Sequence, residues 1–194
     1  MKTKRILLIQ GHPDGSELHL CHALASSYVT GAEEAGHTVR LVNVAALDFP
    51  LLRSQKDFEV DTVPASLKPV QQDVLWAEHL VIFFPLWAGD MPALLKGFFE
   101  QLMRPSFSGE HHSFFDKQVL SGRSARVVVT MGMPALVYRW YFRAHSVKSL
   151  ERNMLGIVGI APVHETLIGL TGNMKPADAS KWLSKLKLLG AAGD

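Results

Sequence analysis

The sequence has one cysteine, Cys21, in 194 residues, and it has no long run of apolar side chains. A single cysteine excludes an intramolecular disulfide and a cysteine-rich metal cluster, so a reducing compartment fits and we expect a cytoplasmic protein. The apolar run near the start ends at Gln10, too early for the hydrophobic region of a signal peptide. Later stretches also fall short of the roughly 20 apolar residues that a membrane-spanning helix needs.

An excess of charge of one sign is also lacking, because 20 lysines and arginines stand against 18 acidic residues, a net charge of +2. This balance gives no field that would favour nucleic acid, and we expect a small-molecule partner instead. Internal repeats and low-complexity segments are absent as well. Because 47% of the residues are apolar, the chain can bury one core, and we expect a single domain over residues 1–194.

What the sequence does contain is an alternation of short strand-like runs and longer amphipathic stretches. Three apolar stripes at helical spacing begin at Cys21, Met91 and Trp182. The alternation predicts an α/β fold, a parallel sheet with helices on both faces, whose ligand lies beyond the carboxyl ends of the strands. The predicted strands are 5–10, 39–44, 80–84, 125–130 and 157–163, and the predicted long functional loops are 49–69 and 107–124.

The first candidate site is the turn Gly-His-Pro-Asp-Gly-Ser between the first predicted strand and helix. Amides and hydroxyls at a helix N-terminus form an anion site, so a phosphate could contact Ser16, His19 and Leu20, with His12 as a further donor. An ordinary turn, in which Asp14 or Ser16 only caps the helix, is an equal alternative. The glycine spacing matches neither the Walker nor the dinucleotide fingerprint, so this signal is weak by itself.

The second candidate is the proline-aromatic-glycine turn after the third predicted strand. Pro85 fixes the exit from the strand, Trp87 offers a flat apolar wall, and Gly89 allows close backbone approach. The alternative is a core tryptophan beside a plain turn glycine.

The third candidate is the turn after the fourth predicted strand. Gly132 could expose amides to a ligand, and Pro134 could open the next helix. The alternative is a tight turn in which Met131 and Met133 belong to the core.

The three turns follow strands whose carboxyl ends meet at one edge of the predicted sheet, so together they predict one site. The segment FPLW followed by MPALLKGFFE, between Phe84 and Glu100, resembles the signature of the NAD(P)H dehydrogenase (quinone) family of flavodoxin-like flavoproteins. Gly-His-Pro in the first turn resembles the start of the phosphate loop of that family. The resemblance covers nearly the whole chain, and it implies a flavodoxin-like three-layer sandwich with five parallel strands in the order 2-1-3-4-5.

The resemblance also implies a bound flavin, FMN or FAD, held by all three turns. The usual family sequence after the fourth strand is Thr-Thr-Gly-Gly, and here Met131 and Met133 replace the second threonine and the second glycine, which changes the space above the ring. The implied contacts are His12, Ser16, His19 and Leu20 on the phosphate side, Pro85, Leu86, Trp87 and Gly89 around the ring, and Thr130, Met131 and Gly132 at its polar edge.

The activity implied by the resemblance is transfer of two electrons as hydride from NADH or NADPH through the flavin to a quinone-like acceptor. Tyr138 and His145 stand downstream of the third turn and are candidates to supply a proton, although His145 could equally be a solvated helix-face residue. The resemblance further implies a homodimer in which the loop from Phe107 to Phe115 reaches over the partner's flavin. No metal is expected.

Two alternatives to this enzyme stay open. A non-catalytic, flavin-binding regulatory subunit that senses nicotinamide redox state would share every cofactor residue. The run His12-Pro13-Asp14 also resembles the start of the zinc-dependent N-deacetylases, but that metal site needs a carboxylate where Gly15 stands.

Overall fold

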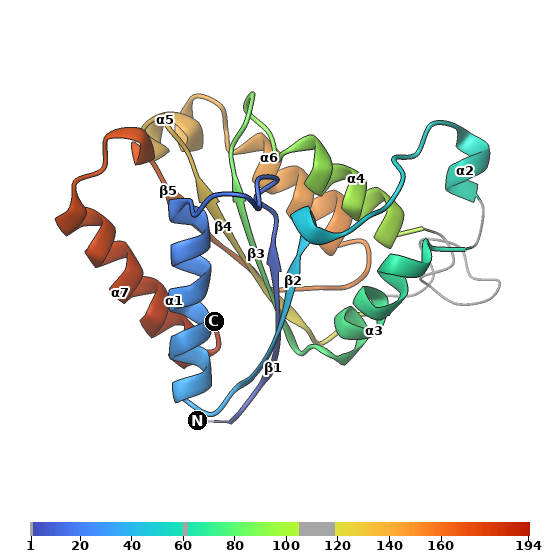
Figure 1. Ribbon diagram of the computed structural model, residues 1–194, viewed down its shortest axis with the longest axis horizontal. Coiled ribbons are helices and arrows are strands. Elements are labelled where there is room, and N and C mark those ends of the chain that lie inside the picture. The colour runs from blue at the N-terminus through green and yellow to red at the C-terminus, as the bar shows by residue number, and fades with distance from the viewer. Residues whose placement is uncertain (1, 60–61, 105–118) are drawn as a thin grey trace.

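The computed structural model describes residues 2–59, 62–104 and 119–194. Five strands form one parallel sheet in the order β2-β1-β3-β4-β5, which confirms the predicted topology (Figure 1). Because β1 pairs with β2 on one side and β3 on the other, the strand order reverses at β1, where α/β sheets bind ligands. The strands are β1 (Arg5–Gln10), β2 (Thr38–Asn43), β3 (His79–Pro85), β4 (Ser124–Thr130) and β5 (Val163–Ile168).

Helices cover both faces of the sheet and complete the three layers (Figure 1). One face carries α1 (Leu20–Glu34) and α7 (Pro176–Ala192). The other carries α3 (Lys68–Trp76), α4 (Ala93–Leu102) and α6 (His145–Ser149). The shorter elements are α2 (Gln55–Glu59), α5 (Ala135–Trp140), the 3₁₀ turns η1 (Val44–Ala46), η2 (Ala65–Leu67) and η5 (Thr171–Asn173), and the π-helical turn η4 (Leu150–Leu155).

The apolar core lies on both sides of the central strands. In β1, Ile6 and Leu8 pack toward α1 and α7, whereas Leu7 and Ile9 pack toward α3 and α4. All seven residues of β3 are buried. Strands that are covered on both faces are apolar throughout instead of alternating, and this is why the sequence marked the central strands clearly.

The helices α1 and α7 pack backbone against backbone, and two glycines permit it. A Cβ atom at Gly31 would lie 1.9 Å from the Lys187 carbonyl oxygen, and one at Gly190 would lie 2.0 Å from the Tyr28 oxygen. No side chain fits at either crossing point.

The first four predicted strands overlap the observed ones, but the fifth prediction is wrong. Residues 156–159 form a turn after η4, and the strand begins only at Val163, just after the cis peptide bond between Ala161 and Pro162. The reason is that β5 is an edge strand, in which His164 and Glu165 are exposed, so its sequence lacks a continuous apolar run.

The three predicted helices correspond to α1, α4 and α7, whereas α3 was not predicted. The expected loop 49–69 also contains α2 and η2. α3 is only nine residues long and has Val70 and Val74 as its buried residues, so its sequence offers a shorter periodic pattern than α1 or α7. Residues 105–118, including most of the expected loop 107–124 and all of the loop from Phe107 to Phe115, lie outside the described residues. No helix in the described ranges is both long enough and apolar enough to cross a membrane.

The histidine at the start of β3 links the fold to pH. His79 is 1% exposed, and its Nδ1 lies 2.7 Å from the Ser124 hydroxyl. Burial, with smaller contributions from Lys4 and Arg126, lowers the pKa of His79 from 6.5 to about 4. Between pH 6.5 and about 4, the His79 imidazole is therefore protonated in the unfolded chain but neutral in the folded protein.

We predict that the free energy of unfolding falls as the pH drops from 6.5 to 4, with His79 contributing on the order of 3 kcal/mol. The variant His79→Gln should show a flatter profile in this window, measured by urea denaturation at several pH values. His145→Gln, which removes an exposed histidine, should keep the slope of the parent. An unchanged slope in His79→Gln would contradict the assignment.

Candidate functional site

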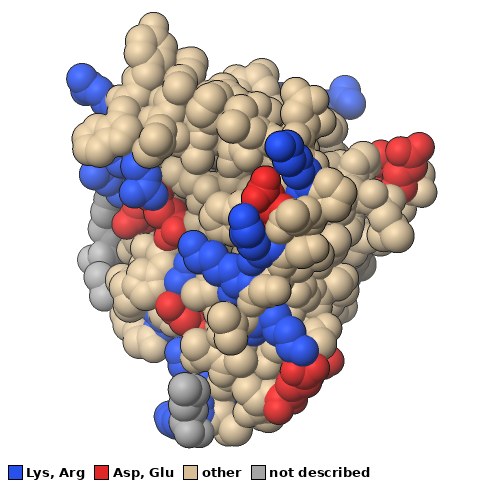
Figure 2. All heavy atoms as spheres, turned by 90° about the vertical axis from the view of Figure 1, so that its left-hand side faces the viewer, with Lys and Arg blue, Asp and Glu red and all other residues tan. Residues whose placement is uncertain are grey.

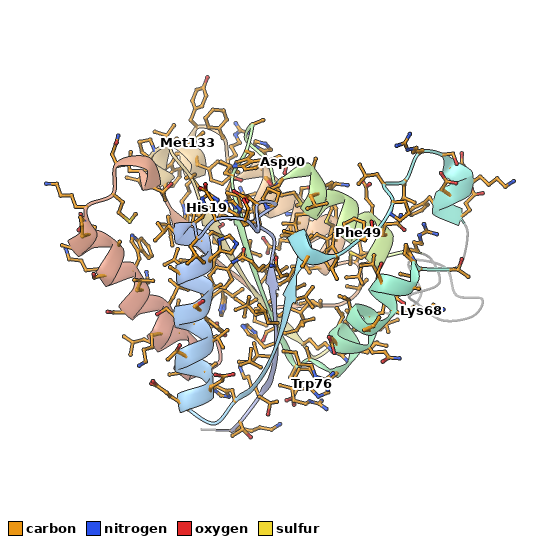
Figure 3. All side chains as sticks on the ribbon, in the orientation of Figure 1. His19, Phe49, Lys68, Trp76, Asp90 and Met133 are labelled. Atoms are coloured by element: carbon orange, nitrogen blue, oxygen red, sulfur yellow. The ribbon has the colours of Figure 1, made fainter. Side chains whose placement is uncertain are left out.

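The three predicted turns meet at the carboxyl ends of the strands. The Gly11 amide donates to the Phe83 carbonyl at 2.7 Å, which ties the turn after β1 to β3. The Leu86 amide donates to the Thr130 carbonyl at 2.8 Å, which ties the turn after β3 to the end of β4. Figure 3 shows one residue near each turn at this end of the sheet. These residues are His19 for the first turn, Asp90 for the second and Met133 for the third.

In the first turn, the carboxylate of Asp14 holds the donors that we expected to bind phosphate. Asp14 Oδ1 accepts from the Ser16 amide at 2.8 Å and from the Ser16 hydroxyl at 2.6 Å, and Oδ2 lies 2.9 Å from His19 Nε2. The Ser16 hydroxyl and then His19 hold the pKa of Asp14 well below its ordinary value. The turn therefore has the hydrogen-bond donors of an anion-binding site, and in this structure the Asp14 carboxylate accepts from them.

His12 is buried beneath this turn and is held as a neutral ring. Its own amide donates to Gln10 Oε1 at 3.1 Å, and its Nδ1 lies 3.2 Å from both the amide nitrogen and the carbonyl oxygen of Asp14. Burial, and next the neighbouring His19, lower the pKa of His12. The rings of His12 and His19 stack with their centroids 4.1 Å apart.

The sequence analysis missed His22, although the spacing His19-x-x-His22 could have drawn attention to it. His22 Nδ1 accepts from the His19 amide at 3.2 Å at the start of α1, so this histidine helps to fix the helix N-terminus. Leu20, the first residue of α1, is half-buried. Asp14, Glu17 and His19 each offer one ligand atom, and these atoms lie within 4.8 Å of one another on the exposed side of the turn.

The second turn is a tight reversal that presents Trp87. The amides and carbonyls of Trp87 and Asp90 exchange two hydrogen bonds of 2.9 Å, and the two residues between them have positive φ, 49° at Ala88 and 83° at Gly89. Trp87 is 51% exposed, so it is not a core tryptophan. Its ring lies edge-on to His12 with the centroids 6.1 Å apart, which joins the first turn to the second.

The strand exit before this turn agrees with the expected placement. Pro85 is the last residue of β3 and is buried opposite Thr130, and Leu86 is half-buried beside the core. Both residues therefore lie at the end of β3, directly before Trp87 in the chain.

The third turn differs from the expectation in its side chains. Thr130 and Met131 were expected to face the polar edge of a ring, but both are buried, and Met131 belongs to the core on the α4 side of the sheet. The Met131 amide is also used, because it donates to the Ile168 carbonyl at 2.9 Å. Gly132 is exposed and has open space where a Cβ would be, so its backbone remains available to a ligand.

Tyr138 and His145 lie close together behind the second turn, with their ring centroids 6.3 Å apart. Tyr138 is fully buried, and this burial raises the pKa of its hydroxyl. His145 is exposed, and its Nδ1 donates to the Phe142 carbonyl at 3.1 Å, so its Nε2 is the ring nitrogen without a hydrogen bond to the described residues. A Cβ built on Gly89 would lie 3.9 Å from the His145 ring, so His145 borders the second turn.

Asp90 and Ser146 form a link that the sequence did not reveal. Asp90 Oδ1 accepts from the Met91 amide at 2.7 Å and from the Ser146 hydroxyl in a short hydrogen bond. The side chain thus fixes the second turn to α6, and with it the place of His145.

Comparisons with known proteins agree with this fold. A family model described as a flavodoxin-like fold matches residues 4–187. The ribosyldihydronicotinamide dehydrogenase-like protein traD of Penicillium crustosum is 30% identical over 157 residues, which cover 66% of this chain and 57% of the fungal protein. The NAD(P)H dehydrogenase (quinone) 1 of Rattus norvegicus is 26% identical over 158 residues, which cover 71% of this chain and 57% of the rat protein. The chain thus spans less than three fifths of the length of these two relatives.

Two solved structures share the fold over nearly their whole length. The NAD(P)H:quinone oxidoreductase from Methanothermobacter marburgensis has a TM-score of 0.81 at 19% identity and covers 98% of this chain and 96% of its own. The FMN-dependent NADH-azoreductase from Bacillus anthracis, solved in complex with FMN, has a TM-score of 0.68 at 17% identity and covers 98% of this chain and 99% of its own. The family match includes the first turn, so the N-deacetylase alternative is dropped. By the match over residues 4–187, this chain belongs to the flavodoxin-like fold family.

Proposed function

We propose that this chain is a flavin-dependent NAD(P)H oxidoreductase that passes two electrons as hydride to a quinone-like acceptor. The observation that carries the proposal is the contact between His12 and Trp87, 6.1 Å between ring centroids, beside the open backbone of Gly132. An anion-binding turn, a half-exposed aromatic wall and a free glycine backbone then lie at one sheet edge. The named quinone dehydrogenases among the relatives support the same activity.

The residues present suit a planar cofactor with a phosphate tail. We place the tail at the first turn, near His12, Ser16, His19 and Leu20. Pro85, Leu86, Trp87 and Gly89 would border the ring, and the Gly132 amide would face its polar edge. A bound flavin would supply a relay for hydride between a nicotinamide and an acceptor in the same cleft.

The chain itself would bind, orient and exchange protons at this site. The Gly132 amide is placed to stabilise negative charge on the bound ring, because it donates to no partner in the described part of the chain. His145, with its free Nε2 beside Gly89, is the better placed of the two proton donors expected from the sequence. The buried Tyr138 hydroxyl would stay protonated and support His145 from behind.

We also infer that a second copy of the chain covers the site. Large apolar side chains are exposed to solvent around this end of the sheet: Leu18 is 96% exposed and Tyr141 is 80% exposed. Such a rim of apolar side chains is typical of a surface that a partner buries. The homodimer expected from the sequence would bury it.

The direct test of the function is turnover. The purified protein, loaded with FMN or FAD, should oxidise NADH or NADPH in a reaction that saturates with a water-soluble benzoquinone, followed at the nicotinamide absorbance. A protein that binds flavin tightly but shows no quinone-dependent oxidation would instead be the regulatory subunit. A protein that binds neither flavin would contradict both.

We predict that Trp87→Ala weakens flavin binding by about tenfold, because one aromatic wall contributes roughly 1–1.5 kcal/mol. The dissociation constant can be measured from the quenching of flavin fluorescence. Trp140→Ala removes another exposed tryptophan, which lies outside the three turns, and should leave flavin affinity unchanged. If Trp87→Ala and the parent bind flavin with equal affinity, the flavin ring does not pack against Trp87.

A second prediction concerns Asp14, whose carboxylate occupies the donors of the first turn. Asp14→Asn should increase the affinity for FMN about threefold to fivefold, because the phosphate no longer lies beside a negative charge. The effect is modest because solvent screens this partly exposed side chain. Riboflavin has no phosphate, so its affinity should not change. Ser16→Ala is the matched control and should weaken FMN alone. Parallel changes for FMN and riboflavin would show that the phosphate lies elsewhere.

A further inference from the structure

A groove of about 480 Å³ runs between α5, β5 and α7, on the face of the sheet that α1 and α7 cover. The residues that we assign to the flavin site do not line it. Two aromatic side chains contribute to its walls. Trp140 is 76% exposed at the end of α5, and Trp182 is half-buried on α7. A concave groove of this volume, with apolar walls and a few polar groups, has the properties of a small-molecule site.

The polar groups of the groove are mainly cationic. Arg126 on β4 lies at the floor with its side chain 8% exposed, and its guanidinium is held by Asp194 at 2.9 Å and by the Thr166 hydroxyl at 2.8 Å. Its Nε is buried and has no hydrogen-bond partner among the described residues. The floor of the groove therefore contains a buried charged donor that the surrounding chain leaves unused, which is costly without a ligand or water.

Two more cations lie on the rim. Lys185 Nζ lies 4.8 Å from the centre of the Trp182 ring, so it adds positive charge above one aromatic wall. Arg139 pairs with Glu165 at 2.5 Å, the one acidic residue that lines the groove. Asp194 pairs with Arg126 and Glu165 pairs with Arg139, so Lys185 is the lining cation that forms no ion pair within the described residues, and the groove keeps a net positive charge.

The positive charge continues beyond the groove. An adjoining hollow of about 400 Å³ shares Arg139, Trp140 and Glu165 with the groove and adds Arg143 and Lys148, which form no ion pair within the described ranges. Figure 2 shows lysine and arginine side chains on this face of the molecule, where α7 lies, with acidic side chains between some of them. A diffusing anion would be attracted to this face as a whole.

We propose that this groove binds a planar aromatic anion, a flat ring system that carries a carboxylate, sulfonate or phosphate. The ring would pack between Trp140 and Trp182, and the acidic group would lie toward Lys185 and the guanidinium of Arg126 at the floor. The apolar walls explain why the ligand is aromatic, and the surplus of cations explains why it is an anion. A second copy of the chain is less suitable, because a hollow of about 480 Å³ has the volume of a small-molecule site.

The test uses 1-anilinonaphthalene-8-sulfonate as the probe and N-phenyl-1-naphthylamine as its uncharged counterpart, with the purified full chain. The sulfonate should bind at one saturable site, with energy transfer from tryptophan, and added FMN should not displace it. Lys185→Gln and Trp140→Ala should each weaken the probe about threefold to tenfold, because each removes one contact to the ligand. Lys181→Gln is the matched control, since Lys181 has the same charge on the same helix but does not line the groove.

Four results would overturn the proposal. The first is an unchanged dissociation constant in both groove variants, and the second is equal binding of the uncharged counterpart. Displacement of the probe by one equivalent of FMN would place it in the flavin site instead. Binding that appears only when a dimer is diluted into monomers would show that a second copy covers the groove.

Discussion

The hydrogen bond from the Gly11 amide to the Phe83 carbonyl is the contact on which the arrangement of the site depends. A Cβ at Gly11 would lie 2.6 Å from a methyl group of Leu95 and 2.9 Å from the Phe83 oxygen, so only glycine lets the chain pass between β3 and α4. Because the first turn leaves the sheet at this point, the His12 ring lies beside Trp87, which follows the neighbouring strand β3. The site is thus a direct consequence of how β1 pairs with β3.

The parts of the fold that could be predicted from the sequence are those where burial leaves a periodic or continuous signal. β3 is buried along its whole length, and the predicted 80–84 falls inside it. β5 is an edge strand with polar residues at 164 and 165, and its prediction failed by several residues. α3 has nine residues, whereas α7 has 17 and was predicted although only Leu186 and Gly190 of it are buried. A helical pattern is recognised more readily when it repeats over several turns.

In the candidate site, too, some features could be predicted from the sequence and others could not. The location of the three turns followed from topology alone, because parallel strands place their carboxyl ends at one edge. The contacts within the turns did not follow, since they depend on tertiary geometry. Asp90 and Ser146 are 56 residues apart and no local pattern pairs them. Met131 shows the same limit, because its burial in the core depends on how the chain turns toward Ile168.

Backbone strain gives an independent reason to place function at this end of the sheet. Among the described residues, the non-glycine positions with positive φ are Ala88, Arg143, Ala144 and Leu170. Ala88 lies in the second turn, Leu170 follows β5, and the other two lie immediately before His145. Each such residue costs roughly 1–2 kcal/mol, and strain of this kind is usually found where a binding site requires it. The surrounding structure holds these residues in place: the Ala144 amide donates to the Tyr138 carbonyl at 3.0 Å, and the Leu170 amide donates to the Met133 carbonyl at 3.1 Å. A fold that needed these turns only to connect strands would gain nothing from such conformations, and their concentration beside Trp87 and His145 argues that the turns are shaped for a ligand.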